Sequence, residues 1–144
     1  MSAAADALRK KGQMKAAKRE GRETREGLVA SYIHATGKVG ALVSVACESD
    51  FVARSEEFKA LVRDLAMHIT ASNPLYLSSD EIPAEVITKE KEIASAEFSG
   101  SGKPANIIEK IVEGKLTKFY ADTCLLAQPF IKDEDVTIAQ HIQQ

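Results

Sequence analysis

The sequence has few cysteines and no long hydrophobic run, and each absence excludes a class of protein. Two cysteines among 144 residues do not make a disulfide framework. Cys47 and Cys124 both lie in apolar surroundings, so we expect buried thiols in a reducing compartment. No apolar stretch approaches the ~20 residues of a membrane helix, and no signal-peptide pattern is present. We therefore expect a cytoplasmic protein that does not bind membranes.

The motifs of catalysis and of metal binding are missing as well. Gly102-Lys103 is followed by Pro104, and Glu97 stands where a phosphate-binding loop has its first glycine, so such a loop is excluded. Neither a paired-cysteine metal spacing nor a His-Glu-x-x-His motif occurs. The histidines are too scattered in sequence to indicate a triad, and their clustering in space stays open: His34, His68 and His141. We predict a protein that is not an enzyme and uses no cofactor or metal.

Positive charge is concentrated near the N-terminus. The net charge is −2, but Arg9 to Arg25 contain eight Lys or Arg against two Glu, a local charge of +6 that leaves −8 for the remainder. Such a segment can indicate a nucleic-acid or membrane surface. This one has no aromatic residues to stack on bases, its Glu residues are interspersed, and the pI is near 5.9. We therefore interpret residues 1–26 as a basic helical linker, with an RNA-binding module as the alternative.

A strand pattern begins after this linker. Gly27 to Ala35 and Lys38 to Cys47 predict the two strands of a hairpin, with the turn at Ala35-Thr36-Gly37-Lys38. In the first strand, one set of alternating residues is mixed in polarity and the other is apolar. Val39 to Cys47 is an apolar, β-branched run of the kind that a buried strand uses. Residues 27–47 therefore predict a small antiparallel sheet.

Helical patterns follow the hairpin. From Ser55, the expected N-cap, apolar residues recur with a period of 3.6 and should cover the sheet. The other helix limits are predicted from turn-forming residues: an end at Asn73-Pro74, starts at Pro83 and Pro104, an interruption or cap at Gly114, a flexible break at Ser99 to Gly102, and a short last helix opened by Thr137. Two strands with four or more helices predict an α+β fold.

The stretch from Val39 to Arg54 combines a strand, a turn and the start of a helix. Its apolar run ends in Glu48-Ser49-Asp50, and Phe51-Val52 follow directly. We expect an acidic residue and an aromatic ring on a turn between two rigid elements, where loops commonly carry binding function. The alternative is an ordinary helix start, with Phe51 packed into the core and Asp50 or Ser49 acting as the cap.

Residues 47–58 read CESDFVARSEEF and resemble the Thr-Asp-Phe-Val signature of the elongation factor Ts family. Further segments resemble this family in the same order and spacing: KAAKREGRETREGLVASYIH before the signature, then LAMHI, NP, EIPAEV, SGKP, VEGKL and QPFIKD after it. The resemblance extends from Leu8 to about Ile142, and the order and spacing together make it specific. Ser49 stands where the family usually has threonine, which keeps the hydroxyl.

The resemblance implies a guanine nucleotide exchange factor that binds elongation factor Tu, a GTPase, and promotes GDP release. In the family, the matching Asp-Phe pair inserts between helices of the guanine-nucleotide domain and disturbs its magnesium site and phosphate loop. The residues implied for this role are Ser49, Asp50, Phe51 and Val52. Val52 would support them by packing, and Arg54 by a surface charge.

A second contact, with the third domain of elongation factor Tu, is implied for His34, Met67 and His68. The alternative for His68 is a partly buried scaffold residue. The alternative for His34 is a solvent-facing strand position. No direct contact with nucleic acid is expected.

The resemblance also implies parts that this sequence does not contain. The family's N-terminal helical domain would precede residues 1–26, and a strand that closes the sheet would follow residues 27–144, the predicted core domain. Without the first we expect weaker binding, and without the second an exposed sheet edge. Short family members pair through their cores, so a homodimer is open. The alternative function is a fragment that binds elongation factor Tu without exchange activity.

Overall fold

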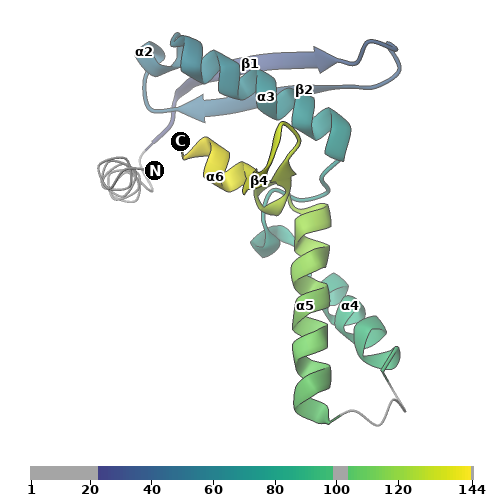
Figure 1. The fold of residues 1–144 in the computed structure, drawn as a ribbon. Coiled ribbons are helices and arrows are strands. Elements are labelled where there is room, and N and C mark those ends of the chain that lie inside the picture. Colours follow the sequence, from purple (N-terminus) through teal and green to yellow (C-terminus); the bar gives the residue numbers. More distant parts are fainter. Residues whose placement is uncertain (1–22, 99–103, 144) are drawn as a thin grey trace, which may run out of the picture. The chain divides into compact units, whose positions relative to one another are not determined.

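A computed structural model describes residues 23–98 and 104–143 (Figure 1). Most of the predicted linker and all of the predicted break at residues 99–102 lie outside these ranges. Helices and two small sheets build the described chain, which confirms the predicted α+β fold. Within the described ranges, no helix has the length and hydrophobicity that crossing a membrane requires.

The described residues form two compact units. The first, here named the hairpin unit, comprises residues 23–73 and 130–143. The second, the helical unit, comprises residues 74–98 and 104–129. The predicted core domain thus contains two separate packing units, each of which has its own buried residues.

The hairpin unit is built on two antiparallel strands, β1 (Glu26–Ile33) and β2 (Gly40–Cys47). Two backbone hydrogen bonds close the turn, from the His34 N–H to the Val39 carbonyl at 2.9 Å and from the Gly37 N–H to the His34 carbonyl at 2.8 Å. Gly37 has a φ of 66°, which glycine adopts without steric cost. The predicted hairpin is confirmed.

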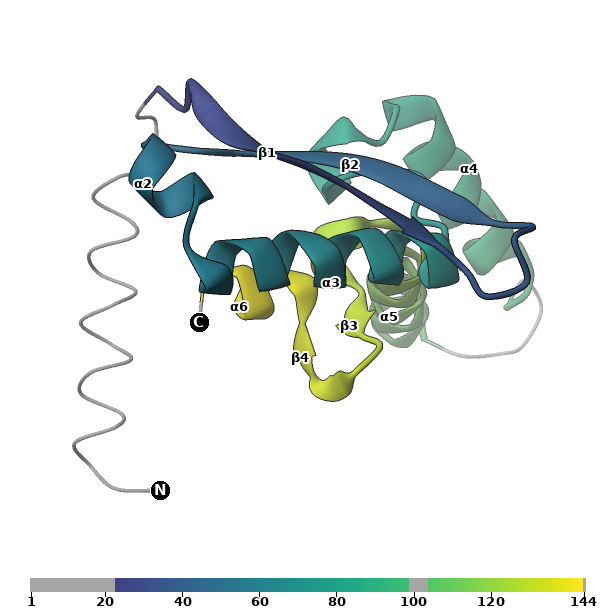
Figure 2. The same ribbon diagram turned by 90° about the horizontal axis from the view of Figure 1, so that it is seen from above.

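Helix α3 (Glu56–Ser72) lies along one face of this hairpin (Figures 1 and 2). Its first turn is capped by Ser55, whose Oγ accepts a hydrogen bond of 3.2 Å from the Phe58 N–H. The helix ends at Asn73, which takes the left-handed conformation with a φ of 44°. Both ends agree with the predicted limits.

The alternation of side chains gives the hairpin a covered and an uncovered face. Seven side chains on the face covered by α3 are partly or fully buried: Leu28, Ala30, Tyr32, Ala41, Val43, Val45 and Cys47. On the other face, Val29 is 59%, Ile33 72% and Leu42 76% exposed. The prediction of a buried strand from Val39 to Cys47 is therefore wrong for half of its residues, because only one face carries a helix.

The chain returns to this unit through a second hairpin that the sequence did not predict. Strands β3 (Pro129–Phe130) and β4 (Asp133–Thr137) form it, and helix α6 (Ile138–Ile142) follows. Three acidic residues open β4, so it lacks the alternation that indicates a strand. A capping box starts α6: Thr137 Oγ1 accepts from the Gln140 N–H at 3.3 Å, and Gln140 Oε1 accepts from the Thr137 N–H at 2.8 Å. The predicted N-cap is confirmed.

The core of the hairpin unit joins α3 to residues 130–143, here named the returning segment. Its most buried residues are Val62, Leu65, Ala66 and His68 of α3 together with Phe130 and Ile138. Ile138 is 0% exposed although it lies close to the end of the described chain. The returning segment is therefore part of the same core as the helix that covers the sheet.

The helical unit consists of two packed helices with a short 3-10 turn at each end. Its elements are η1 (Ser79–Glu81), α4 (Ala84–Ala96), α5 (Ala105–Thr123) and η2 (Leu125–Ala127). Pro83 and Pro104 precede the two helices, as predicted. Gly114 lies inside α5, so the prediction that it interrupts or caps the helix is wrong. A glycine in a helix costs about 1 kcal/mol relative to alanine, which is too little to break a helix of this length.

The two cysteines lie one in each unit. Cys47 is 7% exposed at the end of β2, and Cys124 is 0% exposed after α5. Both are free thiols. Cys124 also forms a parallel β-bridge with Tyr76, which joins the two ends of the helical unit. The prediction of two buried thiols is confirmed.

Candidate functional site

The chain between β2 and α3 is a short helix, α2 (Asp50–Ala53). Ser49 is its N-cap, and its Oγ accepts a hydrogen bond of 3.4 Å from the Val52 N–H. We name residues 49–54 the tip. Because the tip is joined to a paired strand at one end and to the capped start of α3 at the other, both of its ends are fixed.

Phe51 is the feature of the tip that the fold itself does not use. Its side chain is 83% exposed, the largest exposed fraction of any large apolar side chain in the described ranges. Burial of such a side chain contributes roughly 1.5–3 kcal/mol, and here that contribution is not realised. The alternative in which Phe51 packs into the core is therefore wrong, although Ser49 does act as the cap.

The acidic residue of the tip lies beside a cation. Arg54 Nη2 is 3.1 Å from Asp50 Oδ2, one helical turn away, and the two side chains are 80% and 60% exposed. An exposed pair of this kind contributes at most about 1 kcal/mol. The pair therefore leaves the Asp50 carboxylate accessible to another molecule, while Arg54 limits the directions in which it points. The supporting role of Arg54 stays a prediction.

A groove of about 360 Å³ opens beside the tip. Side chains from α2, α3 and α6 line it, including Val52, Phe58, Leu61, Asp64, His141 and Ile142. Val52 is 40% exposed, so it faces this groove and is not enclosed in the core. Sequence patterns did not indicate Asp64 or His141 as neighbours of the tip, because the returning segment brings them together from positions far apart in the chain.

The residues predicted for a second contact do not lie with the tip. His34 is exposed directly after β1, at the turn end of the hairpin, and its Nδ1 is 3.4 Å from Tyr32 Oη. The tip follows β2 at the opposite end (Figure 1). Eight strand residues at about 3.3 Å each separate these ends by roughly 25 Å. His34 and the tip could therefore contact two places on a partner but do not form one pocket.

His68 lies in the core of the hairpin unit. It is 0% exposed, its Nδ1 accepts a hydrogen bond of 3.4 Å from the Ile131 N–H, and its ring centroid is 6.2 Å from that of Phe130. The geometry thus favours the scaffold alternative for His68, since an enclosed side chain does not reach a partner. Its neighbour Met67 is partly buried. The ring of His141 stacks on Phe130 at 4.2 Å, so two of the three histidines lie against one aromatic ring.

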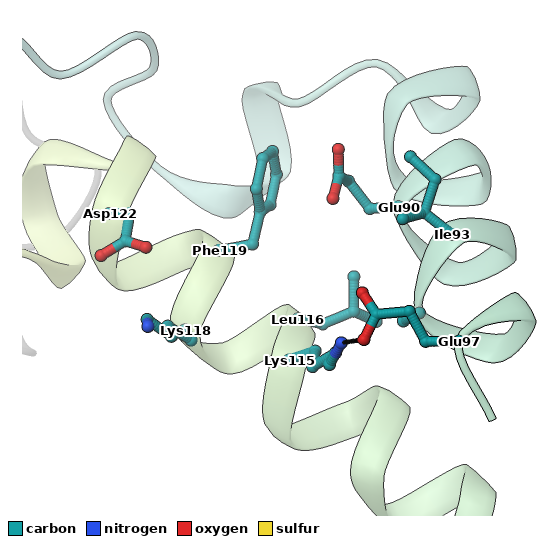
Figure 3. A pocket seen from close by; sticks show the side chains of 9 residues that line it. Glu90, Ile93, Glu97, Lys115, Leu116, Lys118, Phe119 and Asp122 are labelled. Atoms are coloured by element: carbon teal, nitrogen blue, oxygen red, sulfur yellow. Dashed lines mark hydrogen bonds and ion pairs between the residues drawn. The ribbon is translucent and has the colours of Figure 1, made fainter. Parts of the chain in front are cut away.

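The helical unit has a separate groove of about 320 Å³ between α4 and α5 (Figure 3). Two acidic residues, Glu90 and Glu97, lie on the α4 side. The α5 side carries both signs of charge, from Lys115, Lys118 and Asp122. Lys115 forms an ion pair with Glu97 and lies 5.3 Å from the centroid of the Phe98 ring. These contacts join the end of α4 to the middle of α5, which is a structural role. Among the described residues, no group of His, Cys, Asp and Glu side chains is arranged to hold a metal ion.

Comparison with known proteins gives one family. A family model described as "Elongation factor TS" matches residues 5–144. Elongation factor Ts of Geotalea uraniireducens (strain Rf4) is 55% identical over 141 residues, which cover 98% of this chain and 65% of that relative. Elongation factor Ts of Fervidobacterium nodosum is also 55% identical, over 98% of this chain and 72% of the relative. Elongation factor Ts of Koribacter versatilis is 56% identical over 135 residues, which cover 94% of this chain and 62% of that relative. The chain spans about two thirds of the length of these relatives, and it belongs to the elongation factor Ts family.

Proposed function

We propose that this chain is the core of a translation elongation factor that binds elongation factor Tu in the cytoplasm and promotes the release of GDP. In this role Asp50 and Phe51 insert near the magnesium and phosphate site of the GTPase. The observation that carries the proposal is the exposed Phe51 ring on a helix whose two ends are fixed. Membership of the elongation factor Ts family supports the choice of partner. No covalent bond changes in this process, so the chain is not an enzyme in this role.

Nucleotide release follows from a difference in affinity. A GTPase holds GDP through backbone N–H groups, a lysine and a magnesium ion around the phosphates. A partner that binds the empty form more tightly than the loaded form shifts the population toward the empty form. By linkage, GDP must then weaken the binding of the partner by the same factor. A fixed ring suits this task, because a mobile one would lose conformational entropy on insertion.

One ring does not supply enough energy for complete exchange. Shifting a two-state population from 1:99 to 99:1 requires about 5.5 kcal/mol of differential affinity. Burial of Phe51 supplies roughly 1.5–3 kcal/mol. A second contact area is therefore needed, and the uncovered face of the hairpin offers exposed apolar surface near His34, including Ile33 and Leu42. A homodimer would compete for this face, and the mass of the chain in gel filtration would reveal it.

The linkage relation provides the test. We expect the affinity of the chain for elongation factor Tu to fall when GDP and magnesium are added, as measured by titration calorimetry with the empty and loaded GTPase. Asp50→Asn should reduce this difference, because the carboxylate acts near the magnesium site. Glu109→Gln, an exposed position on α5, serves as the charge-matched control.

The competing function predicts a different result. A fragment that only docks on elongation factor Tu would bind the empty and loaded forms with equal affinity, and it would not accelerate GDP release. Equal affinities for the two forms would therefore overturn the exchange function while leaving the partner intact. An absence of binding to either form would overturn the choice of partner as well.

A further inference from the structure

We propose that Asp64 is a positioning residue for the tip, because it holds the returning segment on α3 and so keeps α6 at the side of the groove that Val52 faces. The effect on GDP release rests on the proposed function, whereas the effect on the order of the tip does not. In this proposal Asp64 acts on the tip through α6. The proposal depends on three observations: the partners of Asp64, the surroundings of His141, and the groove that α2 and α6 both line.

Asp64 lies where α3 meets two parts of the returning segment. Its Oδ1 accepts a hydrogen bond of 2.6 Å from Lys132 Nζ, in the turn between β3 and β4. Its Oδ2 is 3.7 Å from His141 Nε2, in α6. The Asp64 side chain is only 22% exposed, so both contacts are partly shielded from water. A single carboxylate thus joins two points that are separated by β4 and most of α6.

His141 is held between that carboxylate and an aromatic ring. It stacks on Phe130 with a centroid distance of 4.2 Å and an interplanar angle of 17°. Within the described residues, its Nε2 is buried and has no hydrogen-bond partner, and the Asp64 carboxylate is the charged group that faces it. A buried polar atom without a hydrogen-bond partner costs free energy. The Asp64 carboxylate, 3.7 Å away, is the acceptor that this Nε2 reaches with a small approach of α6 toward α3. Removal of the carboxylate takes away that acceptor.

The position of α6 matters to the tip because α2 has only four residues. A helix of this length is not stable by itself, so its geometry is set by the elements around it. Val52 of α2 and Ile142 of α6 line the same groove. Phe58 and Leu61 of α3 line it as well. If α6 moves away, Val52 loses one apolar wall of its surroundings. The Ser49-capped turn that carries Phe51 should then open more often.

Hydrogen exchange of the free protein tests this coupling. The Ala53 and Arg54 N–H groups donate to the carbonyls of Ser49 and Asp50 at 3.1 Å each, so their exchange rates report the order of α2. We expect Asp64→Asn to accelerate exchange of these two amides about fivefold, the factor that corresponds to about 1 kcal/mol, the upper value for an ion pair with an exposed partner. Amides in the middle of α3 report the stability of the whole unit and should change less.

Matched variants separate positioning from general destabilisation. Lys132→Met removes the ion pair between Lys132 and Asp64. Because the Lys132 side chain is exposed, this variant should reproduce part of the effect without disturbing the core. Asp64→Glu keeps the charge and should restore slow exchange at Ala53. Asp80→Asn, an exposed position in the helical unit, should leave it unchanged.

Two outcomes are decisive. Unchanged exchange at Ala53 and Arg54 in both Asp64→Asn and Lys132→Met would overturn the positioning role, and so would equal acceleration at α2 and in the middle of α3. Faster exchange at α2 alone, with GDP release from elongation factor Tu as fast as for the wild type, would confirm the positioning role and count against the proposed function of the tip.

Discussion

The two units of this chain differ in where they leave apolar surface uncovered. In the hairpin unit, Phe51, Leu42 and Ile33 are 83%, 76% and 72% exposed, and they lie on a capped helix and on paired strands. In the helical unit, the most exposed large apolar side chains are Leu75 and Leu77, which precede the first helical turn. Apolar side chains on paired strands and on the tip can bind a partner without first being ordered, which supports the proposal that the hairpin unit makes the contact.

The first prediction tests whether the two units keep their own stability. Ile138→Ala removes a side chain that is 0% exposed in the core of the hairpin unit, and such changes cost about 2–5 kcal/mol. Amides of α3 should lose protection in hydrogen exchange by that amount, whereas amides of α5 should change less. Ile107→Ala, at a 40% exposed position on α5, is the matched control and should have little effect. Equal loss of protection in both units would show that they unfold as one.

The second prediction applies one substitution to both units with opposite results. At Gly27 a β-carbon would lie 2.4 Å from the Val45 carbonyl oxygen, whereas at Gly114 it would meet nothing within 4 Å. Gly27→Ala should destabilise the hairpin unit by about 1–3 kcal/mol, because the backbone of β2 must move. Gly114→Ala should stabilise α5 by about 0.5–1 kcal/mol. Denaturant titration followed by hydrogen exchange would measure both, and a shift of the same sign at the two sites would contradict the account.

The third and smallest prediction concerns pH. The hydrogen bond from Lys59 to Glu56, at 2.8 Å, and the positive charge of Lys59 lower the pKa of Glu56 below its usual value. A carboxyl whose folded pKa is lowered stabilises the fold above its unfolded pKa, and this contribution is lost as the pH falls through the folded value. Lys59→Gln should therefore reduce stability slightly at neutral pH and not at strongly acidic pH. Lys110→Gln on α5 is the control, and a difference that persists in acid would contradict the assignment.

Local features of the fold were predictable from the sequence. The hairpin, the Ser55 and Thr137 caps and the end of α3 at Asn73 depend on residues close together in the chain. The second hairpin was not predictable, because β4 begins with three acidic residues and its partner β3 has two residues. The exposure of Leu42 was not predictable either, since an apolar strand does not indicate how many of its faces will be covered.

The candidate site was predictable in position but not in surroundings. The change from an apolar strand to Asp50-Phe51 marks the tip, yet the pattern allows the ring to point inward or outward. The cluster of His68, Phe130 and His141 depends on the returning segment, which packs against α3 from more than 60 residues away in the chain. Contacts of this range leave no periodic pattern in the sequence.

The most direct test of the central claim is the rate at which elongation factor Tu releases labelled GDP in the presence of this chain. We predict that Phe51→Ala slows the accelerated release roughly 10- to 150-fold, the factor that corresponds to 1.5–3 kcal/mol of lost burial in the complex. The stability of the Phe51→Ala variant should equal that of the wild type, because the Phe51 ring is exposed. Leu75→Ala removes an exposed apolar side chain from the helical unit. With this variant, elongation factor Tu should release GDP as fast as with the wild type. Equal rates for Phe51→Ala and the wild type would contradict the account.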